Sequence, residues 1–557
     1  MKKRRLTEQG HALVKKIIFV LVLIALIAVA VFAIKSNKLN IKLPWDKAET
    51  TESLSKDDNT EKKETKATSE NKVKETTASI EKSASDKNAT FNLAVEPWSG
   101  WFAAAAANGS RQTTPDSIFG QSGIDVNIIV EEDDAIKLTA LINGDIDALG
   151  TTVNRLAVMS KEISDNNLEV IVPFFTDYSS GGDGIVANSK YTSIESLKNA
   201  KIGLSKESVS HVMLGYLIKQ SGLTDEEQKQ VMNDVFTYDG TDAAYEAYFR
   251  GEVDVLATWE PSLSKALNYT DSTLLFSTKT TSKLVSDCIV VRKDYADAHP
   301  EVLNAFIDGC LQVAEDLKTG TNKLEYYDNF DNVFPEYEST EESLDVDLAN
   351  ATLMDWSSNK NSFDETAKYI FSTMCEVWED IGKETVPEMA ETIFDSSFID
   401  SLASKYENLG NINDSTIVVN DENRDDLIQT DALLNKSVRV NFKANTCYFM
   451  DNAEAAAILD EFIATAKILD GTIIQIEGNV ASEQSSEYDY TLSLLRAETI
   501  EEYFISQGID ARRMITIGNG GDKKIANNYE ADGVTLSKSG TDANRRTDIM
   551  FKQFELE

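Results

Sequence analysis

Residues 134–152 read DAIKLTALINGDIDALGTT, and residues 242–259 read DAAYEAYFRGEVDVLATW. Each stretch predicts a helix, a glycine at the left-handed exit of that helix, and a short buried strand of aliphatic residues. Because this helix-to-strand unit occurs twice, about a hundred residues apart, the sequence predicts two similar α/β lobes. Ligands of open α/β sheets bind beyond the carboxyl ends of the strands. The strand ends at Thr151, Thr152 and Trp259 are therefore candidate binding positions.

A third segment, residues 205–219, reads SKESVSHVMLGYLIK and predicts a helix that starts near Ser208. Ser208 and Ser210 are of a residue type that caps helices, and His211 follows them. The unpaired N–H groups and the dipole at a helix N-terminus favour an anion. The pattern leaves two roles for His211, which either donates a hydrogen bond to such an anion or packs beneath the helix.

Residues 91–409 resemble the periplasmic substrate-binding proteins of ABC transporters for nitrate, aliphatic sulfonates, taurine and thiamine precursors. Besides the segments above, the resemblance rests on motifs in the family's order: PWSGWF at 97–102, SLKNAKIG at 196–203, TWEP at 258–261 and VVRKDY at 290–295. It implies a type II fold of two α/β lobes that close on a small solute. The ligand contacts that it implies are Trp98, Trp101, Thr151, Thr152, Ser208, Ser210, His211, Trp259 and Glu260.

The sign of the ligand's charge is left open by acidic residues near these positions. The resemblance implies an anionic or zwitterionic solute. However, Glu207 stands where the family often has Gly, and Glu96 and Glu260 add further negative charge beside the expected site. A cationic or neutral solute therefore stays open, as does a cleft that has lost transport binding.

Residues 436–557 predict a small α/β sandwich with one sheet and one helical layer. Val438, Val440 and Phe442 alternate as in a strand, and residues 455–469 have apolar side chains at helical spacing. The remaining expected elements are strands at Ile474–Ile476, Met514–Ile517 and Thr547–Phe551, and a helix that presents Leu492, Leu495, Ile500, Tyr503 and Phe504 and closes at Gly508.

This segment resembles the OmpA/MotB C-terminal domain, through FKAN at 442–445, LSLLRA at 492–497, GIDARR at 508–513 and NR at 544–545. In that family an Asp and an Arg clamp the zwitterionic end of the peptidoglycan stem peptide. Arg496 fills the Arg position, whereas Ala481 replaces the Asp and Asp489 is a partial substitute. The implied peptidoglycan contacts are Asn445, Asp489, Arg496 and Arg545. The equal alternative is that the domain keeps this fold but does not bind peptidoglycan.

The N-terminal residues predict a membrane anchor and a spacer. Residues 17–34 are uncharged and almost wholly apolar, and residues 1–16 are basic. The positive-inside rule therefore places residues 1–16 in the cytoplasm and the bulk of the chain outside, in a periplasm or a cell wall. A cleaved signal peptide is the rival interpretation, since residues 28–30 read AVA. Residues 35–90 predict a disordered linker, and residues 410–435 a polar connector.

Composition favours binding over catalysis. The chain of 557 residues has a net charge of −39, which disfavours nucleic acid, and it has only three histidines. We find no catalytic or metal-binding motif and expect no cofactor, and the four cysteines predict buried free thiols. We expect a single-pass membrane protein that captures a small solute, with an ABC permease as a further partner, and that binds peptidoglycan. The alternative is an envelope scaffold or sensor, and an enzyme ranks third.

Overall fold

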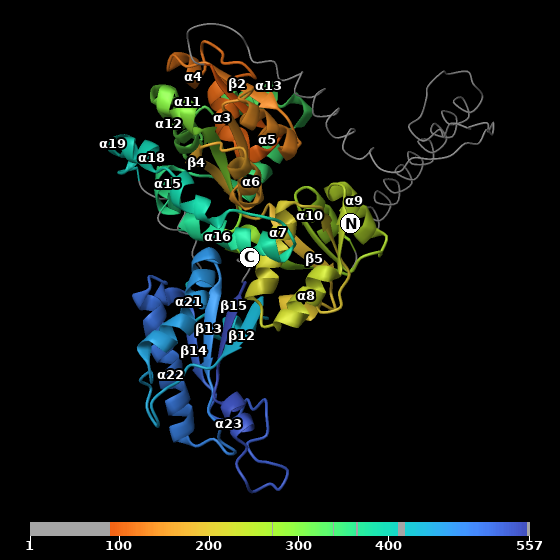
Figure 1. Cartoon of the computed structure of the whole chain (residues 1–557), viewed down its shortest axis with the longest axis vertical. Coiled ribbons are helices and arrows are strands. Elements are labelled where there is room, and N and C mark those ends of the chain that lie inside the picture. Colours follow the sequence, from red (N-terminus) through yellow and green to blue (C-terminus); the bar gives the residue numbers. More distant parts are fainter. Residues whose placement is uncertain (1–89, 270, 338, 364–365, 410–417, 554–557) are drawn as a thin grey trace, which may run out of the picture. The chain divides into compact units, whose positions relative to one another are not determined.

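The computed structural model describes residues 90–269, 271–337, 339–363, 366–409 and 418–553. The expected membrane helix at 17–34 lies outside these residues, as does the expected linker up to residue 89. No helix in the described part of the chain is both long enough and apolar enough to cross a bilayer. Figure 1 shows the chain coloured along its sequence, with many of its helices and strands labelled.

A six-stranded sheet in the order β11-β4-β10-β3-β1-β2 forms the first lobe. Strand β1 pairs in parallel with β2 and β3, whereas β10 is antiparallel to both β3 and β4. The strands are β1 (Phe91–Val95), β2 (Val126–Val130), β3 (Ala148–Thr152), β4 (Val170–Ser179), β10 (Ser286–Arg292) and β11 (Ala351–Leu353).

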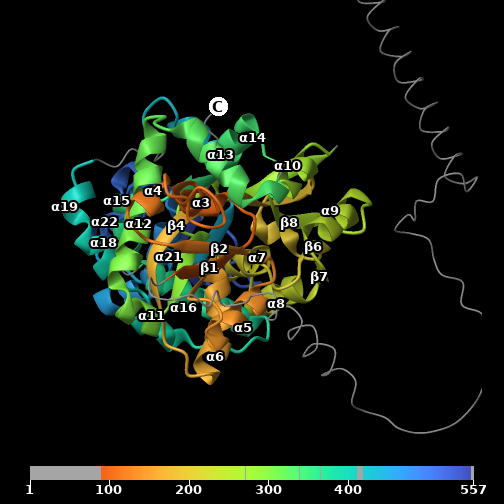
Figure 2. The same cartoon turned by 90° about the horizontal axis from the view of Figure 1, so that it is seen from above.

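Helices cover both faces of this sheet because its strands are apolar on both sides. Phe91, Leu93 and Val95 of β1 pack in a core with α3 and α12, whereas Ala94 packs in a second core with α5 and α6. Figure 2 shows α3 and α12 on one side of β1 and β2, and α5 and α6 on the other. The helices of this region are α3 (Phe102–Asn108), α4 (Ile118–Gln121), α5 (Asp134–Asn143), α6 (Val153–Asp165), α11 (Lys293–Ala298), α12 (Pro300–Lys318), α13 (Lys323–Val333) and α14 (Glu341–Asn350).

A five-stranded sheet in the order β7-β6-β8-β5-β9 forms the second lobe. Its strands are β5 (Asp183–Asn188), β6 (Ile202–Ser205), β7 (Val235–Tyr238), β8 (Val255–Trp259) and β9 (Ser272–Ser277), and its helices are α7 (Val209–Gln220), α8 (Asp225–Asn233), α9 (Thr241–Phe249) and α10 (Ser262–Leu267). Strand β6 is parallel to β7 and β8, and β5 is antiparallel to β8 and β9. The chain passes between the sheets from β4 to β5 and returns from β9 to β10.

The two repeated units occupy equivalent places in the two sheets. Helix α5 leads through Gly144 into β3, and α9 leads through Gly251 into β8. Both glycines have positive φ, of 75° and 68°, as expected for the exit of a helix. Each of the two strands lies between a parallel neighbour and an antiparallel strand that enters from the other lobe. The prediction of two similar α/β lobes is confirmed.

Helices after β11 pack against both lobes. They are α15 (Trp356–Phe363), α16 (Thr366–Asp380), α17 (Ala390–Ile393), α18 (Ser397–Ser401) and α19 (Ala403–Tyr406). Helix α16 contacts α6 of the first lobe and α7 of the second. The indole N–H of Trp378 on α16 donates to the carbonyl of Asn154, at 2.8 Å.

The C-terminal domain has a four-stranded sheet in the order β12-β15-β13-β14. Its elements are α20 (Arg424–Gln429), β12 (Leu434–Val438), α21 (Asn452–Ile468), β13 (Ile473–Gly478), α22 (Glu487–Ser506), β14 (Met514–Gly518), α23 (Lys538–Asn544) and β15 (Thr547–Lys552). The expected apolar face of α21 is buried.

Details of this domain differ from the expected pattern. The first strand lies at Leu434–Val438 because these residues pair with β15, and the chain leaves the sheet before Phe442. Leu495 is 42% exposed, so it lies outside the buried face of α22. The expected connector also contributes to the core, since Leu427 packs against Ile473 and Ile515.

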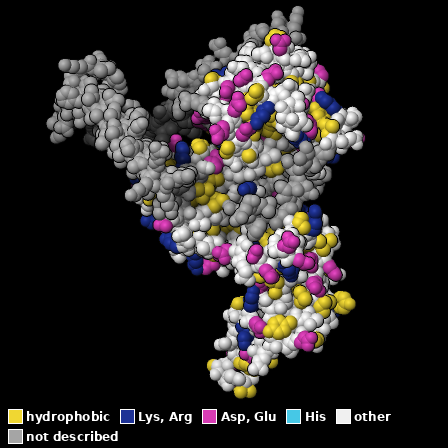
Figure 3. Space-filling view, turned by 180° about the vertical axis from the view of Figure 1, so that it is seen from behind, with side chains coloured by type: hydrophobic (Ala, Val, Ile, Leu, Met, Phe, Trp, Pro, Cys, Tyr) yellow, Lys and Arg dark blue, Asp and Glu magenta, His cyan; other side chains and the backbone are white. Residues whose placement is uncertain are grey.

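The acidic surface and the burial of the cysteines agree with what the composition predicts. Acidic side chains are distributed over much of the face shown in Figure 3. Cys288, Cys310 and Cys375 are buried free thiols, and Cys447 is a partly buried free thiol.

Candidate ligand-binding sites

A cavity of about 750 Å³ lies where strands of both lobes end. The first lobe contributes residues 96–98 after β1, residues 132–135 around the start of α5, and Thr151 and Thr152 at the end of β3. The second lobe contributes Ser205 from the end of β6, residues 206–209 after it, Tyr238 from β7 and Trp259 from β8. The strand ends therefore form the wall, as expected for open α/β sheets.

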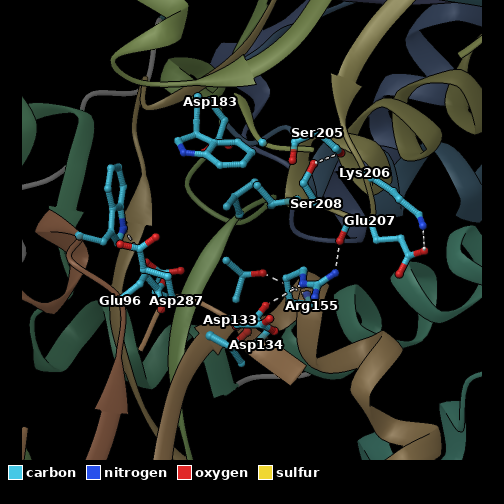
Figure 4. Close-up of a pocket in the computed structure, with 18 of the residues that line it drawn as sticks. Glu96, Asp133, Asp134, Arg155, Asp183, Ser205, Lys206, Glu207, Ser208 and Asp287 are labelled. Carbon is cyan, nitrogen blue, oxygen red and sulfur yellow. Dashed lines mark hydrogen bonds and ion pairs between the residues drawn. The ribbon is translucent and has the colours of Figure 1, made fainter. Parts of the chain in front are cut away.

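The side chains in Figure 4 surround one opening. Glu96 and Asp287 lie on one side, and Ser205 and Ser208 lie on the other. Among the residues expected to contact a ligand, those on the cavity wall are Trp98, Thr151, Thr152, Ser208 and Trp259.

Trp101 lies in the core of the first lobe. It is 1% exposed, and its ring packs against Gly150 of β3, where an added Cβ would lie 2.6 Å from the Trp101 ring. Gly150 is therefore required by this close approach.

Glu260 is another expected ligand contact that lies outside the cavity wall. It accepts hydrogen bonds from the amide and the hydroxyl of Ser264, at 3.1 and 2.7 Å, at the start of α10.

Ser210 and His211 are buried within α7, behind the cavity wall. The ring of His211 lies against Trp378, with centroids 6.2 Å apart. Burial lowers the pKa of His211 to about 4, so its imidazole is neutral at pH 7. The hydroxyl of Ser208 donates to the carbonyl of Ser205 at 2.7 Å. Of the two roles that the sequence left to His211, this geometry favours packing.

Three buried aspartates on the cavity wall were missed by sequence reasoning. Asp177, Asp183 and Asp287 are 2%, 4% and 6% exposed. Asp177 and Asp287 are direct partners across β4 and β10, and an added Cβ at Gly100 would lie 2.5 Å from both carboxylates. The signal was a single Asp in each of three largely apolar strand sequences, VIVPFFTDYS, DGIVAN and SDCIVVR. Such residues need a polar partner once buried.

Hydrogen bonds hold these carboxylates in place, but burial has the largest effect on their pKa values. Asp287 accepts from the indole N–H of Trp98 at 2.9 Å, and Asp177 accepts from the Thr176 hydroxyl at 2.9 Å. Burial, the largest effect, raises the pKa of Asp177 to about 7 and that of Asp183 to about 6. Burial and the neighbouring Asp177 raise the pKa of Asp287 as well.

The nearby cations are already paired. Lys137, fully buried behind the wall, forms ion pairs with Glu96 and with Asp134, at 2.9 Å from the latter. Burial alone would lower the pKa of Lys137, but these carboxylates outweigh it and raise that pKa. Arg155 pairs with Asp134 at 2.9 Å and also donates to the Glu207 carbonyl.

A second cavity, of about 470 Å³, lies in the C-terminal domain. All of the residues expected to contact peptidoglycan line it: Asn445, Asp489, Arg496 and Arg545. Ala481 lines this cavity as well. Sequence reasoning missed two further arginines in this wall, Arg439 and Arg546.

Arg496 is held in place without a carboxylate partner among the described residues. Its Nε donates to the Thr446 carbonyl at 3.0 Å, and its guanidinium lies 4.9 Å from the centre of the Phe442 ring. Burial lowers the pKa of Arg496 from its usual value. A half-buried guanidinium fixed in this way is suited to a carboxylate ligand.

Asp489 is the acidic residue on the described wall of the second cavity. It accepts from the Ser486 amide at 2.9 Å and the Ser486 hydroxyl at 2.8 Å, in a capping box that starts α22. These bonds lower the pKa of Asp489 and hold its carboxylate charged.

Comparisons with known proteins give two families for two parts of the chain. The model described as NMT1/THI5 like matches residues 118–319, and the model of the OmpA family matches residues 441–535. Outer membrane protein A of Bordetella avium is 33% identical over 101 residues, which are 17% of this chain and 52% of that protein. The chain thus spans about half the length of this curated relative.

Solved structures also align with this chain. The periplasmic aliphatic sulphonate binding protein SsuA from Escherichia coli is 13% identical, with a TM-score of 0.43, covering 56% of this chain and 99% of that one. The periplasmic nitrate-binding protein NrtA from Synechocystis is 12% identical, with a TM-score of 0.42, covering 57% and 89%.

Proposed function

We propose that this chain, which joins an NMT1/THI5-like domain to a C-terminal OmpA domain, is an extracytoplasmic solute-binding protein anchored in the membrane and tethered to peptidoglycan. The observation that supports solute capture is the cavity of about 750 Å³ at the strand ends of both lobes. A ligand there touches both lobes at once, so its binding favours their closed arrangement.

Reversible binding explains this cavity better than covalent catalysis. The Ser208 hydroxyl on the wall is bonded to a backbone carbonyl, and His211 lies behind the wall with its pKa lowered to about 4. These two residues therefore do not form the hydroxyl–imidazole pair that nucleophilic catalysis needs. We infer that closure and reopening of the lobes is the working step, with delivery to an ABC permease as its outcome.

The cavity of the C-terminal domain supports wall binding through a carboxylate. Arg496 and Arg545 line it, and Arg496 has its guanidinium in place without a carboxylate partner in the described chain. We propose that these arginines hold a carboxylate of the stem peptide and that Asp489 faces the ammonium group. Ala481 puts a methyl group where the family has an Asp, and this residue favours the second candidate, an envelope scaffold that keeps the fold without the ligand.

Solute capture is tested by thermal unfolding of the detergent-solubilised full chain with nitrate, ethanesulfonate, taurine, a pyrimidine and organic amines. A ligand at a hundredfold its Kd adds about 2.7 kcal/mol to the free energy of unfolding. We expect one class of solute to raise the melting temperature, and Trp259→Ala to abolish the rise. Phe249→Ala is the matched control, because Phe249 is 49% exposed and lies outside the cavity wall. A flat panel would favour the scaffold.

Wall binding is tested by sedimentation of the full chain with purified peptidoglycan. Arg496→Ala is expected to leave the protein in the supernatant. Arg512→Ala is the control, since Arg512 pairs with Asp510 and lies outside the second cavity. Equal sedimentation of Arg496→Ala and the unaltered chain would argue against this site.

A further inference from the structure

The cavity between the lobes has a wall of strongly negative character. The acidic residues on it are Glu96, Glu132, Asp133, Asp134, Asp177, Asp183, Glu207, Asp239 and Asp287, and the basic residues are Arg155 and Lys206. An anion that entered would meet this field, whereas a cation would be attracted by it.

The few cations near the wall are engaged by a subset of these carboxylates. Lys137 and Arg155 neutralise Glu96 and Asp134, and Lys383 pairs with Glu207 at 2.6 Å. No ion pair joins Asp177, Asp183 or Asp287 to a Lys or Arg among the residues that the structure describes. Glu132, Asp133 and Asp239 on the wall also have no ion pair with a Lys or Arg in the described chain, and the three aspartates are the most buried of these unpaired acidic residues.

One carboxylate oxygen of Asp183 lacks a hydrogen-bond partner among the described residues, and this is independent evidence for a ligand in the cavity. It is 4% exposed, it lines the cavity, and its Oδ1 has no hydrogen-bond partner in the described part of the chain. A buried acceptor without a partner is costly, and a bound donor removes that cost. Its backbone N–H is already used, since it donates to the Ser179 and Thr278 hydroxyls at 3.1 and 3.2 Å. The free oxygen is thus available for a ligand N–H or a positive charge.

Two aromatic rings accompany the carboxylates. Trp259 is the register partner of Asp183 across β8 and β5, and Trp98 donates its indole N–H to Asp287. An added Cβ at Gly182 would lie 3.7 Å from the Trp98 ring, so Trp98 of the first lobe lies close to the backbone beside Asp183. Indole faces next to carboxylates attract organic cations through the ring quadrupole.

We propose that the solute taken up between the lobes is a small organic cation, a protonated amine or a quaternary ammonium compound, held by Asp183 from the second lobe and by Asp177 and Asp287 from the first. This assignment rests on the proposed function, because it names the class of solute for the same cavity. A cavity of about 750 Å³ accommodates an organic molecule and is much larger than a bare metal ion.

The competing anion site at the start of α7 lacks the groups that it needs. The Ser208 hydroxyl is bonded to the Ser205 carbonyl, Glu207 carries negative charge next to it, and the His211 imidazole is buried and neutral. The sequence left the sign of the ligand's charge open, and the buried aspartates favour the cation.

The test is titration calorimetry of the full chain in detergent with choline and putrescine, and with ethanesulfonate and nitrate as anions. The neutral isostere of choline, 3,3-dimethylbutan-1-ol, separates charge from shape. We expect a cation to bind saturably, the neutral isostere to bind at least about tenfold more weakly, and the anions not to bind. Asp183→Asn keeps the shape of the side chain and is expected to weaken cation binding about tenfold or more. Asp242→Asn is the matched control, because Asp242 is exposed on α9 and lies outside the wall.

The outcomes separate the two proposals. Binding of ethanesulfonate or nitrate that is lost in Trp259→Ala would overturn the cation assignment and leave solute capture standing. Tighter binding of Ca²⁺ than of any organic cation would also overturn it. If no probe of either sign binds, solute capture fails together with the assignment. Circular dichroism of Asp183→Asn confirms that a loss of binding is not a loss of folding.

Discussion

Binding of choline should tighten as the pH rises from 5 to 8. Choline carries a permanent charge, so any pH dependence comes from the protein. Burial raises the pKa of Asp183 to about 6 and that of Asp177 to about 7, so both carboxyls hold protons at pH 5. A cation favours their ionised forms, and each proton must leave before or during binding.

The size of the effect follows from those two pKa values. If Asp183 alone must ionise, the affinity at pH 5 is about tenfold lower than at pH 8, or about 1.4 kcal/mol. If Asp177 must ionise as well, the loss is about a thousandfold, or about 4 kcal/mol. The charged groups that face these carboxyls are Asp287 and Glu96 near Asp177, and Glu260 near Asp183. Asp183 and Glu96 oppose the ionisation of Asp177, and Glu260 opposes that of Asp183. The hydrogen bond with Asp287 favours the ionised form of Asp177 but does not outweigh its burial, so the sign is not reversed.

Calorimetry at several pH values measures this directly. Repeating each titration in buffers of different ionisation enthalpy counts the protons released, and we expect net release near pH 6.5. Asp183→Asn should remove the part of the pH dependence of the affinity that comes from the ionisation of Asp183. An affinity that is flat, or that weakens as the pH rises, would refute the reasoning.

Three further predictions concern the folded chain itself. Because burial raises the pKa values of Asp177 and Asp183 above 3.8, these two carboxyls hold more protons in the folded state than in the unfolded state, and their contribution to stability falls as the pH rises from about 4 to 7. The melting temperature of Asp177→Asn should therefore rise relative to that of the unaltered chain over this window. Gly150→Ala places a Cβ 2.6 Å from the Trp101 ring and should lower the free energy of unfolding in urea by about 1–3 kcal/mol. Leu427→Ala should destabilise the C-terminal domain by about 2–4 kcal/mol, measured by hydrogen exchange of β13 and β14.

Each of these has an outcome that contradicts it. A difference in melting temperature between Asp177→Asn and the unaltered chain that is the same at pH 4 and at pH 7 would mean that Asp177 ionises easily. A Gly150→Ala protein of unchanged stability would mean that the Trp101 ring moves freely. Val534→Ala is the control for Leu427→Ala, since Val534 is 80% exposed, and equal effects of the two would place Leu427 outside the core.

The sequence was informative wherever the determinant was local. Helix exits at Gly144 and Gly251 depend on a few neighbouring residues, and they led to the strand ends that line the cavity at Thr151, Thr152 and Trp259. Trp98 and Trp101 are only three residues apart, yet one lines the cavity and the other is buried. That difference depends on how the turn after β1 sits against Gly150, which spacing alone does not give.

The acidic pair could not be found by local pattern because strand pairing brings it together. Asp177 and Asp287 are separated by the whole second lobe in the sequence, and only the antiparallel pairing of β4 with β10 places them side by side. The motifs of the resemblance do not include these two aspartates, although VVRKDY begins in β10 three residues after Asp287. The residues that determine the sign of the cavity's charge are thus outside the motifs that identify the fold.

The positions of the three buried aspartates connect ligand binding to movement of the lobes. Asp177 lies near the end of β4 and Asp183 starts β5, so they flank the first passage between the sheets, and Asp287 lies just after the second passage. Repulsion between Asp183 and Asp177 raises the pKa of Asp177. A cation placed among these carboxylates removes that repulsion where the chain passes between the lobes. The same contacts that bind the solute would therefore stabilise the closed arrangement, and no separate trigger for closure is needed.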